Sequence, residues 1–469
     1  MTWGFANVDV LAQRLAASPF LPSAALPPEL QTLDYDTYRL IAFEHAQAIW
    51  KGHTPFWLEC FHRGYLFRDK VAINLVESGQ PTPLAFSPAL FQYRGALSNL
   101  QPPADSGFAG FRALGRFESS PNYLELASFL GASYFRAIGE GQVYGSSARG
   151  LAIDVGLPKA EEFPVFRAFW IERPAEGDRG LRFWALLDSR SVAGAYEFVM
   201  LPGANTTFDV RARLHFRRTP EKLGLAPITS MWMWGDGRPG PAGDPRPKVH
   251  DSDGLLIQTA AGEWVWRPLV RMNYPSLSHY DLAGVRGFGL MQRDRRPERF
   301  LDDEAKYHLR PSVWIEPKRG WAEGAVELLE LPADHEGIDN IAAWWTPKAR
   351  PQPGEPLDLD YRVSFSSVAP EESGLARAVE TRVDRVGETR VTIDFAAAAA
   401  HAPQAALPTA DVVAQRGAVR DVQVIEPSPG VWRVSFVVVP EGDAPVELSA
   451  RLRQADQVIS ETWRYLCPN

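Results

Sequence analysis

The segment FDVRARLHFR, residues 208–217, alternates strictly between apolar and polar side chains. Its apolar members are Phe208, Val210, Ala212, Leu214 and Phe216. A period of two residues is typical of a β-strand that buries one face in a core. The other face carries an aspartate, a histidine and three arginines. We therefore expect that face to be wet or to line a groove.

Other short strand-like runs lie on both sides of this segment. They cover residues 182–187, 196–201, 255–259 and 326–330, and turns rich in glycine, proline and aspartate separate them. Many short strands joined by such turns favour an antiparallel β-sandwich over an alternating β/α fold. We therefore predict a mainly β protein.

Two helices are expected before the first strands. The first begins near Asn7 or Asp9 and stops before Pro22. The second begins near Asp36, a suitable N-cap residue, and places apolar residues and a histidine at steps of three and four up to residue 49.

A proline-rich polar stretch, residues 347–356, indicates a domain border there or slightly beyond it. Strand-like runs follow at residues 390–395, 431–439, 446–453 and 458–466. About a hundred residues with strands of this kind suit an immunoglobulin-like sandwich.

Charge and cysteine content exclude several function classes. The 469 residues include 49 Lys and Arg against 57 Asp and Glu, a net charge of −8, with no basic run. This balance argues against nucleic acid as a partner. No stretch approaches the ~20 apolar residues that span a bilayer, so no stable membrane insertion is expected. Cys60 and Cys467 favour two free thiols, although one long-range bridge stays open.

No metal or cofactor site is recognisable. The nine histidines never cluster at ligand spacing, and no glycine-rich dinucleotide loop or nucleophile elbow is present. We expect chemistry that needs neither a metal nor a cofactor.

Tryptophans crowd one region of the chain. Of the fifteen, eight fall between residues 232 and 345: Trp232, Trp234, Trp264, Trp266, Trp314, Trp321, Trp344 and Trp345. Asp251 and two acidic stretches, residues 302–304 and 334–340, lie in the same region. Aromatic rings beside two carboxylates suit a carbohydrate groove, with Trp234, Trp266 and Trp314 as candidate substrate-binding rings. The alternative is that these rings are ordinary core residues.

A second candidate surface comes from tyrosines and arginines at short intervals. Tyr134 and Arg136 lie in one run, and Tyr144 and Arg149 lie in a glycine-rich run just after it. These side chains could donate hydrogen bonds to sugar hydroxyls. Equally, the arginines could form structural ion pairs with Glu140 or Asp154.

Several long motifs carry a family resemblance. They include LGASYFR (130–136), GQVYG (141–145), APITSM (226–231), HDS (250–252), WVWRPL (264–269) and DNI (339–341). In this order they resemble the periplasmic glucan biosynthesis proteins of the MdoG (OpgG/OpgD) type. The resemblance covers nearly the whole chain.

The resemblance implies a two-domain fold. Residues 1–368 would form a large mutarotase-like β-sandwich with a cleft, and residues 369–469 a smaller immunoglobulin-like β-sandwich. The border moves beyond the prolines because residues 357–365 look like the last strand of the first domain.

The resemblance also implies a chemistry and a site. Members of the family resemble inverting endo-β-1,2-glucanases, which would make this chain a glycoside hydrolase acting on β-1,2-glucan. By motif, Asp339 corresponds to the general acid and Asp251 to the second carboxylate, which we expect to be the base. Tyr307 and Arg310 match residues of the cleft and are expected to bind substrate. An inverting pair typically lies ~6.5–9.5 Å apart.

Three alternatives stay open at this point. The same cleft could transfer or cyclise glucan chains, the two carboxylates could exchange roles, or the protein could be a non-catalytic glucan-binding scaffold. A glucan synthase complex and a second copy of the chain are candidate partners. The resemblance implies a periplasmic location, and we attribute the missing leader to a processed or recombinant form, with an intracellular relative as the alternative.

Overall fold

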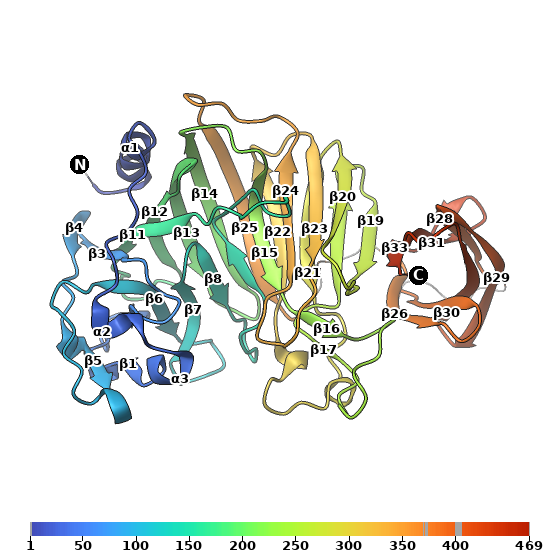
Figure 1. Ribbon diagram of the computed structural model, residues 1–469, viewed down its shortest axis with the longest axis horizontal. Helices are drawn as coiled ribbons and strands as arrows, with labels where there is room; N and C mark the ends of the chain where they lie inside the picture. Colours follow the sequence, from blue (N-terminus) through green and yellow to red (C-terminus); the bar gives the residue numbers. More distant parts are fainter. Residues whose placement is uncertain (1, 369, 371–373, 399–405, 469) are drawn as a thin grey trace. The chain divides into compact units, whose positions relative to one another are not determined.

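A computed structural model describes residues 2–368, 370, 374–398 and 406–468 (Figure 1). The protein is mainly β, as predicted, and its strands form several sheets. The chain divides into two compact units. Unit 1 contains Met1–Pro227, Ile315–Gly324 and Trp344–Ser366. Unit 2 contains Ile228–Trp314, Ala325–Ala343 and Ser367–Asn469.

Unit 1 contains two main sets of strands. The first runs in the order β25 (Leu357–Ser366), β14 (Thr206–Phe216), β13 (Val192–Leu201), β12 (Leu181–Asp188), β11 (Val165–Glu172), β3 (Ala72–Glu77), β4 (Gln80–Pro83). The second runs in the order β2 (Trp57–His62), β6 (Phe108–Gly115), β7 (Leu124–Leu130), β8 (Tyr134–Ala137), β9 (Ser147–Arg149). Pairing is antiparallel except between β3 and β11, which run parallel.

Smaller elements complete unit 1. They are α1 (Phe5–Ala16), α2 (Pro28–Gln31), α3 (Tyr35–Tyr38), β1 (Ile41–Phe43), β5 (Phe91–Tyr93), β10 (Leu151–Ile153), and the 3₁₀ turns η1 (His45–Gln47), η2 (Pro88–Leu90) and η3 (Gly95–Leu97). The chain passes from one unit to the other five times, once directly after β25 and four times within a strand: β15 (Leu223–Ser230), β22 (Ser312–Arg319), β23 (Gly324–Glu330) and β24 (Ile341–Pro347).

Phenylalanines from both sets of strands pack together in unit 1. The Phe129 ring of β7 lies 5.5 Å from Phe169, 5.1 Å from Phe183 and 5.4 Å from Phe198, ring centre to ring centre. All four side chains are buried. Burial of one such ring contributes ~1.5–3 kcal/mol. The packing of these rings therefore stabilises the contact between the two sets of strands.

The predicted strand at residues 208–217 is β14, and its apolar face is buried. Its polar face is only partly wet, because α1 packs on part of it while Arg211 stays exposed. Arg213 and His215 contact Asp9 of α1 at 3.0 and 2.7 Å, and the Arg211 guanidinium lies 4.2 Å from the Phe5 ring centre. The alternation predicted the strand but not its contact with α1, which lies far from β14 in sequence.

The first predicted helix is α1, but the second prediction was wrong. Residues 36–49 contain only the end of the four-residue helix α3, then β1 and a 3₁₀ turn. The N-cap is Asp34, whose side chain accepts from the Thr37 N–H at 2.8 Å. Strand β1 pairs with β5, bringing Phe43 opposite Phe91. This long-range pairing overrides the helical spacing.

Unit 2 holds the rest of the predicted strands. In one sheet β18 (Gly254–Thr259) lies between β19 (Trp264–Pro268) and β21 (Val285–Met291), and β19 runs parallel to β33 (Thr462–Cys467). Beyond β33 follow β31 (Val446–Gln454), β28 (Thr409–Gln415) and the short β32 (Gln457–Val458). A separate sheet has the order β26 (Arg377–Asp384), β27 (Thr389–Ala396), β30 (Val431–Pro440), β29 (Gly417–Ser428).

Short elements of unit 2 are β16 (Trp232–Trp234), β17 (Val249–His250), β20 (Ser276–Leu282), η4 (Pro297–Arg299) and η5 (Tyr307–Leu309). The predicted border at residue 368 stays a prediction. Ser367 begins the last segment of unit 2, and that unit also contains Ile228–Trp314.

Two further observations bear on the sequence expectations. Cys60 and Cys467 are free thiols, and both are buried. None of the helices among the described residues is both long and apolar enough to cross a membrane.

Candidate functional site

Asp251 follows a short strand whose neighbours fix it in place. Strands β16 and β17 pair, with Trp232 opposite His250. The Asp251 N–H then donates to the Met231 carbonyl at 2.8 Å, and the Ser252 hydroxyl meets the Ser230 hydroxyl at 2.8 Å. Asp251 is 3% exposed. Its backbone is therefore locked to the segment of residues 229–232.

Asp339 lies on the loop between β23 and β24, and its neighbour Asn340 anchors that loop. The Asn340 side chain accepts from the Trp232 N–H and donates to the Trp232 and Leu331 carbonyls, all at 2.9 Å. The Leu331 N–H donates to the Asn340 carbonyl at 2.8 Å and closes the neck of the loop. Asn340 is 1% exposed, whereas Asp339 next to it is exposed.

Asp339 also contacts the segment of residues 229–232 directly. The Thr229 hydroxyl donates to Asp339 Oδ2 at 3.4 Å. Two residues of chain span at most ~7 Å, so Thr229 and Met231 are close neighbours. One segment of four residues thus holds the backbone of Asp251 and a side-chain oxygen of Asp339, although the two aspartates are far apart in sequence. The structure brings the two predicted catalytic carboxylates to the same strand end.

Arg310 makes the charged contact to Asp251. Arg310 Nη1 donates to Asp251 Oδ1, and Arg310 Nε donates to the Ala305 carbonyl at 3.1 Å. The guanidinium carbon lies 4.4 Å from the centre of the Tyr307 ring. A buried carboxylate needs such a partner, because burial without one is costly.

Tyr307 is placed beneath Arg310 and not on an open surface. Its side chain is 1% exposed and packs against Phe300, with ring centres 6.2 Å apart. Burial, followed by the charge of Glu336, raises the pKa of Tyr307 above its usual value. The ring therefore supports the arginine, and a direct contact of Tyr307 with substrate stays a prediction.

Gln292 joins the segments that carry Asp251 and Tyr307. Its amide nitrogen donates to the carbonyls of His250 at 2.9 Å and Tyr307 at 3.0 Å, and its oxygen lies 2.9 Å from His250 Nδ1. His250 is fully buried. Burial, with a smaller contribution from the charge of Lys248, lowers the pKa of His250 to about 3. The imidazole is therefore neutral at ordinary pH and serves as a structural hydrogen-bonding group.

Arg246 connects three loops around this site. It forms ion pairs with Asp244 at 2.8 Å, Asp302 at 2.9 Å and Glu336 at 2.9 Å. The hydrogen bonds to Asp244 raise the pKa of Arg246 above its usual value. Burial acts in the opposite direction and is the smaller effect. Glu336 belongs to the same loop as Asp339. Arg246 therefore restrains the middle of the acidic loop, whereas Asn340 anchors its neck.

The clustered tryptophans are mostly packing residues. Seven of the eight are buried: Trp232, Trp234, Trp264, Trp266, Trp314, Trp344 and Trp345. Trp314 stacks on Trp264, Trp266 lies 3.6 Å from the Arg293 guanidinium carbon, and Trp234 donates to the Arg246 carbonyl at 2.9 Å. The structure gives Trp234, Trp266 and Trp314 a packing role, and a substrate contact for any of them stays a prediction.

The tyrosines and arginines predicted near residues 134–149 belong to unit 1. Tyr134 pairs with Arg149 across β8 and β9, and the guanidinium lies 4.9 Å from the tyrosine ring centre. Arg149 is buried and pairs with Glu161 at 3.0 Å, so its partner is neither Glu140 nor Asp154. Asp154 pairs with Lys159 instead, at 2.9 Å.

Arg136 and Tyr144 are both half-buried in the same unit. Arg136 lies opposite Ser128 in the pairing of β7 with β8. Burial, more than the charge of Glu125, raises the pKa of Tyr144 well above its usual value. Sugar binding by these two residues stays a prediction.

Three supporting residues were missed by sequence reasoning. Gln292 is the first polar residue after the buried strand β21, which is a usable signal for a residue at the end of a core strand. Asn340 was noted only as part of a motif. Arg246 lies in a proline-rich loop and carries no signal of its own, because its three partners come from distant parts of the chain.

The polar groups of this site are carboxylates, side-chain amides and a guanidinium. Among the described residues, no group of three or more His, Cys, Asp and Glu is arranged to hold a metal ion. The site as built offers two carboxylates, one exposed and one buried against an arginine. Such a pair can donate a proton on one side of a bond and accept one on the other.

Comparisons with known proteins show which family the chain belongs to. The family model described as "Periplasmic glucan biosynthesis protein, MdoG" matches residues 3–467. The chain is 44% identical to glucans biosynthesis protein D 1 of Ralstonia nicotianae, over 97% of this chain and 89% of that protein. The matched range spans both units of the chain. The chain therefore belongs to the MdoG family of periplasmic glucan biosynthesis proteins.

Proposed function

We propose that the protein is an inverting endo-β-1,2-glucanase that processes glucan chains in the periplasm. The observation that carries this proposal is the attachment of Asp251 and Asp339 to one segment, residues 229–232. Family membership supports a glucan as the ligand, and the name of the Ralstonia relative supports a role in glucan biosynthesis.

Asp339 acts as the general acid in this proposal. It is exposed beside the anchored neck of its loop, so its carboxyl group can reach a bound sugar chain. It gives its proton to the glycosidic oxygen as the bond from that oxygen to the anomeric carbon breaks. The Thr229 hydroxyl suits this cycle, because a hydroxyl can donate to the carboxylate and accept from the acid.

Asp251 acts as the general base. It takes a proton from the water that attacks the anomeric carbon from the face opposite the leaving oxygen. Arg310 compensates the charge of the buried carboxylate and fixes the orientation of its oxygens. Tyr307, Arg310 and Gln292 therefore act as positioning residues for Asp251. No cofactor enters the scheme.

The test is turnover of linear β-1,2-glucan by Asp339→Asn, with Asp334→Asn as the matched control. Asp334 is exposed on the same loop. We expect Asp339→Asn to lose about 10²–10⁴-fold in kcat, the usual contribution of a general acid, and to bind glucan normally. Asp334→Asn should keep the rate of the unmodified protein. Equal rates for the two variants would overturn the role of Asp339.

The same assay separates hydrolysis from its rivals. A transferase or cyclising enzyme gives elongated chains or rings lighter by one water than the linear product. A non-catalytic scaffold binds the glucan and releases no product at any pH. Either outcome would contradict the hydrolase proposal.

A further inference from the structure

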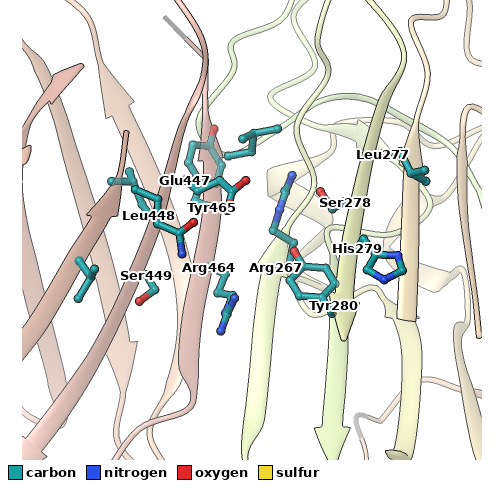
Figure 2. Close-up of a pocket in the computed structure, with 13 residues that line it drawn as sticks. Arg267, Leu277, Ser278, His279, Tyr280, Glu447, Leu448, Ser449, Arg464 and Tyr465 are labelled. Carbon is teal, nitrogen blue, oxygen red and sulfur yellow. The ribbon is translucent and has the colours of Figure 1, made fainter. Parts of the chain in front are cut away.

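Unit 2 contains a cavity of about 350 Å³ whose lining includes none of the residues of the candidate site. Figure 2 shows Arg267, Ser278 and Tyr280 on one side and Glu447, Ser449 and Arg464 on the other. The first three come from β19 and β20, and the others come from β31 and β33. The side chains that line the cavity are different from those that hold Asp251 and Asp339 in place.

The cavity forms where two parallel strands separate. Strands β19 and β33 pair only at Val265 with Thr462 and at Trp266 with Trp463. Arg267 and Arg464 come next on the two strands and line the opening. Pro268 follows Arg267 and has no N–H with which to extend a ladder. The opening is therefore a feature of the strand geometry.

The charges that line the cavity are nearly balanced. Arg267 is 2% exposed and pairs with Glu330 at 2.8 Å, so its charge is already compensated. His279 is likewise held between Glu327 at 2.9 Å and Asp281 at 3.0 Å. The Arg267 pair is neutral, whereas the two carboxylates beside His279 leave that group net negative, which disfavours an anionic ligand there.

Arg464 and Glu447 are the remaining charged lining residues. Both are exposed, and neither has an ion-pair partner within the part of the chain that the structure describes. One is a donor and the other an acceptor, so a neutral ligand with many hydroxyl groups can satisfy both. An ionic ligand would leave one of them opposed, and a lipid chain would leave both without partners.

An aromatic ring completes the cavity. Tyr280 is half-buried, and the Arg464 guanidinium carbon lies 5.8 Å from its ring centre. A tyrosine ring presents an apolar face and a polar tip, which suits a sugar ring with hydroxyls at its rim. The hydroxyls of Ser278 and Ser449 add further donors and acceptors.

We propose that this cavity is a second glucan-binding site, which holds a short stretch of the chain that the candidate catalytic site acts on. The proposal rests on the proposed function for the identity of the sugar. The volume falls near the lower end of small-ligand pockets, ~300–1,000 Å³, so the site accommodates a few sugar units at most. Its role would be to retain long chains, because a second contact raises the apparent affinity of a polymer but not of a short oligosaccharide.

The test uses two variants and one control. Ser449→Trp fills the cavity, and Arg464→Ala removes an exposed donor with little risk to folding. Arg390→Ala is the matched control, because Arg390 is an exposed arginine of β27 that does not line the cavity. Each is measured with long linear β-1,2-glucan and with a short oligosaccharide of the same linkage.

We expect both cavity variants to raise KM for the long glucan by about tenfold through loss of the second contact, with kcat unchanged. Turnover of the short oligosaccharide should not change. Calorimetric binding of long glucan, measured in the Asp339→Asn background, should lose one binding event with each cavity variant. The Arg390→Ala protein should behave like the unmodified protein in every assay.

The outcomes separate this inference from the proposed function. If the protein binds glucan in two events and does not hydrolyse it, the proposed function fails and the second site stands. If it hydrolyses glucan and the cavity variants match Arg390→Ala, the second site is overturned and the hydrolase stands. If no glucan binds at all, both are overturned. Should Ser449→Trp fail to fold, Arg464→Ala decides the question.

Discussion

Asn340→Asp is the substitution that best probes the anchor of the acidic loop. It keeps the size of the side chain, so no cavity forms. It removes the two hydrogen bonds that the Asn340 amide donates to the carbonyls of Trp232 and Leu331. It also turns a carboxylate oxygen toward those carbonyl oxygens in a site that is 1% exposed.

The expected cost follows from the two carbonyl oxygens that no longer receive a hydrogen bond. Each buried acceptor left without a donor costs ~1–3 kcal/mol, so two give ~2–6 kcal/mol in the free energy of unfolding. Because Asn340 adjoins Asp339, the same change should lower kcat on β-1,2-glucan by about tenfold or more. The assay is urea unfolding followed by tryptophan fluorescence, together with initial rates below the unfolding transition.

Asn122→Asp is the control for this prediction. Asn122 is exposed, so the substitution adds the same charge without removing a buried hydrogen bond. It should change stability by less than ~0.5 kcal/mol, as ordinary surface substitutions do. If Asn340→Asp matched this control in both stability and rate, the anchor role of Asn340 would be refuted.

Three further predictions concern the same surroundings. Arg310→Gln should lower kcat more than it raises KM, because Asp251 loses its cation, and Arg310→Lys should recover part of the loss in steady-state kinetics. The pKa of His250 is about 3 when folded and ~6.5 when unfolded, so the unfolded state binds more protons between these values. Stability should then fall as pH drops through this window by up to ~1.4 kcal/mol per pH unit, and His250→Gln should remove that share of the slope in urea titrations. Lys248→Met removes the buried cation that Asp236 and Asp294 share, while Asp294 keeps Arg296, so it should lower the urea midpoint by an amount equivalent to ~1–3 kcal/mol; an unchanged midpoint would contradict the pairing.

Patterns that are local in sequence predicted the strands well. The alternation at residues 208–217 gave β14 because period two can bury only one face of an extended chain. The strand-like runs at residues 390–395 and 446–453 correspond to β27 and β31 for the same reason. None of these patterns indicated that α1 packs on part of the polar face of β14, since α1 lies about two hundred residues earlier in the chain.

Spacing misled where a distant partner decided the structure. Residues 38, 41, 45 and 49 fall at helical steps, but Ile41–Phe43 pairs with Phe91–Tyr93. The tryptophan excess was likewise a correct observation with an incomplete interpretation. Composition cannot say which face of a strand a ring occupies, and the structure buries Trp266 beneath Arg293.

The candidate site depended on the family resemblance for its two aspartates. Nothing in the spacing of Asp251 and Asp339 predicts that both meet the segment of residues 229–232, because that contact exists only after the sheet forms. Arg310 was predicted as a substrate-binding residue, and the structure adds its contact with Asp251.

The most direct test of the account is the anomeric configuration of the first products from linear β-1,2-glucan, followed by proton NMR from the start of the reaction. An inverting pair built from Asp339 and Asp251 predicts that the new reducing ends appear first as the α-anomer and then equilibrate. The Asp339→Asn protein should release almost none. Reducing ends that appear first as the β-anomer, or no reducing ends at all from the unmodified protein, would contradict the central claim.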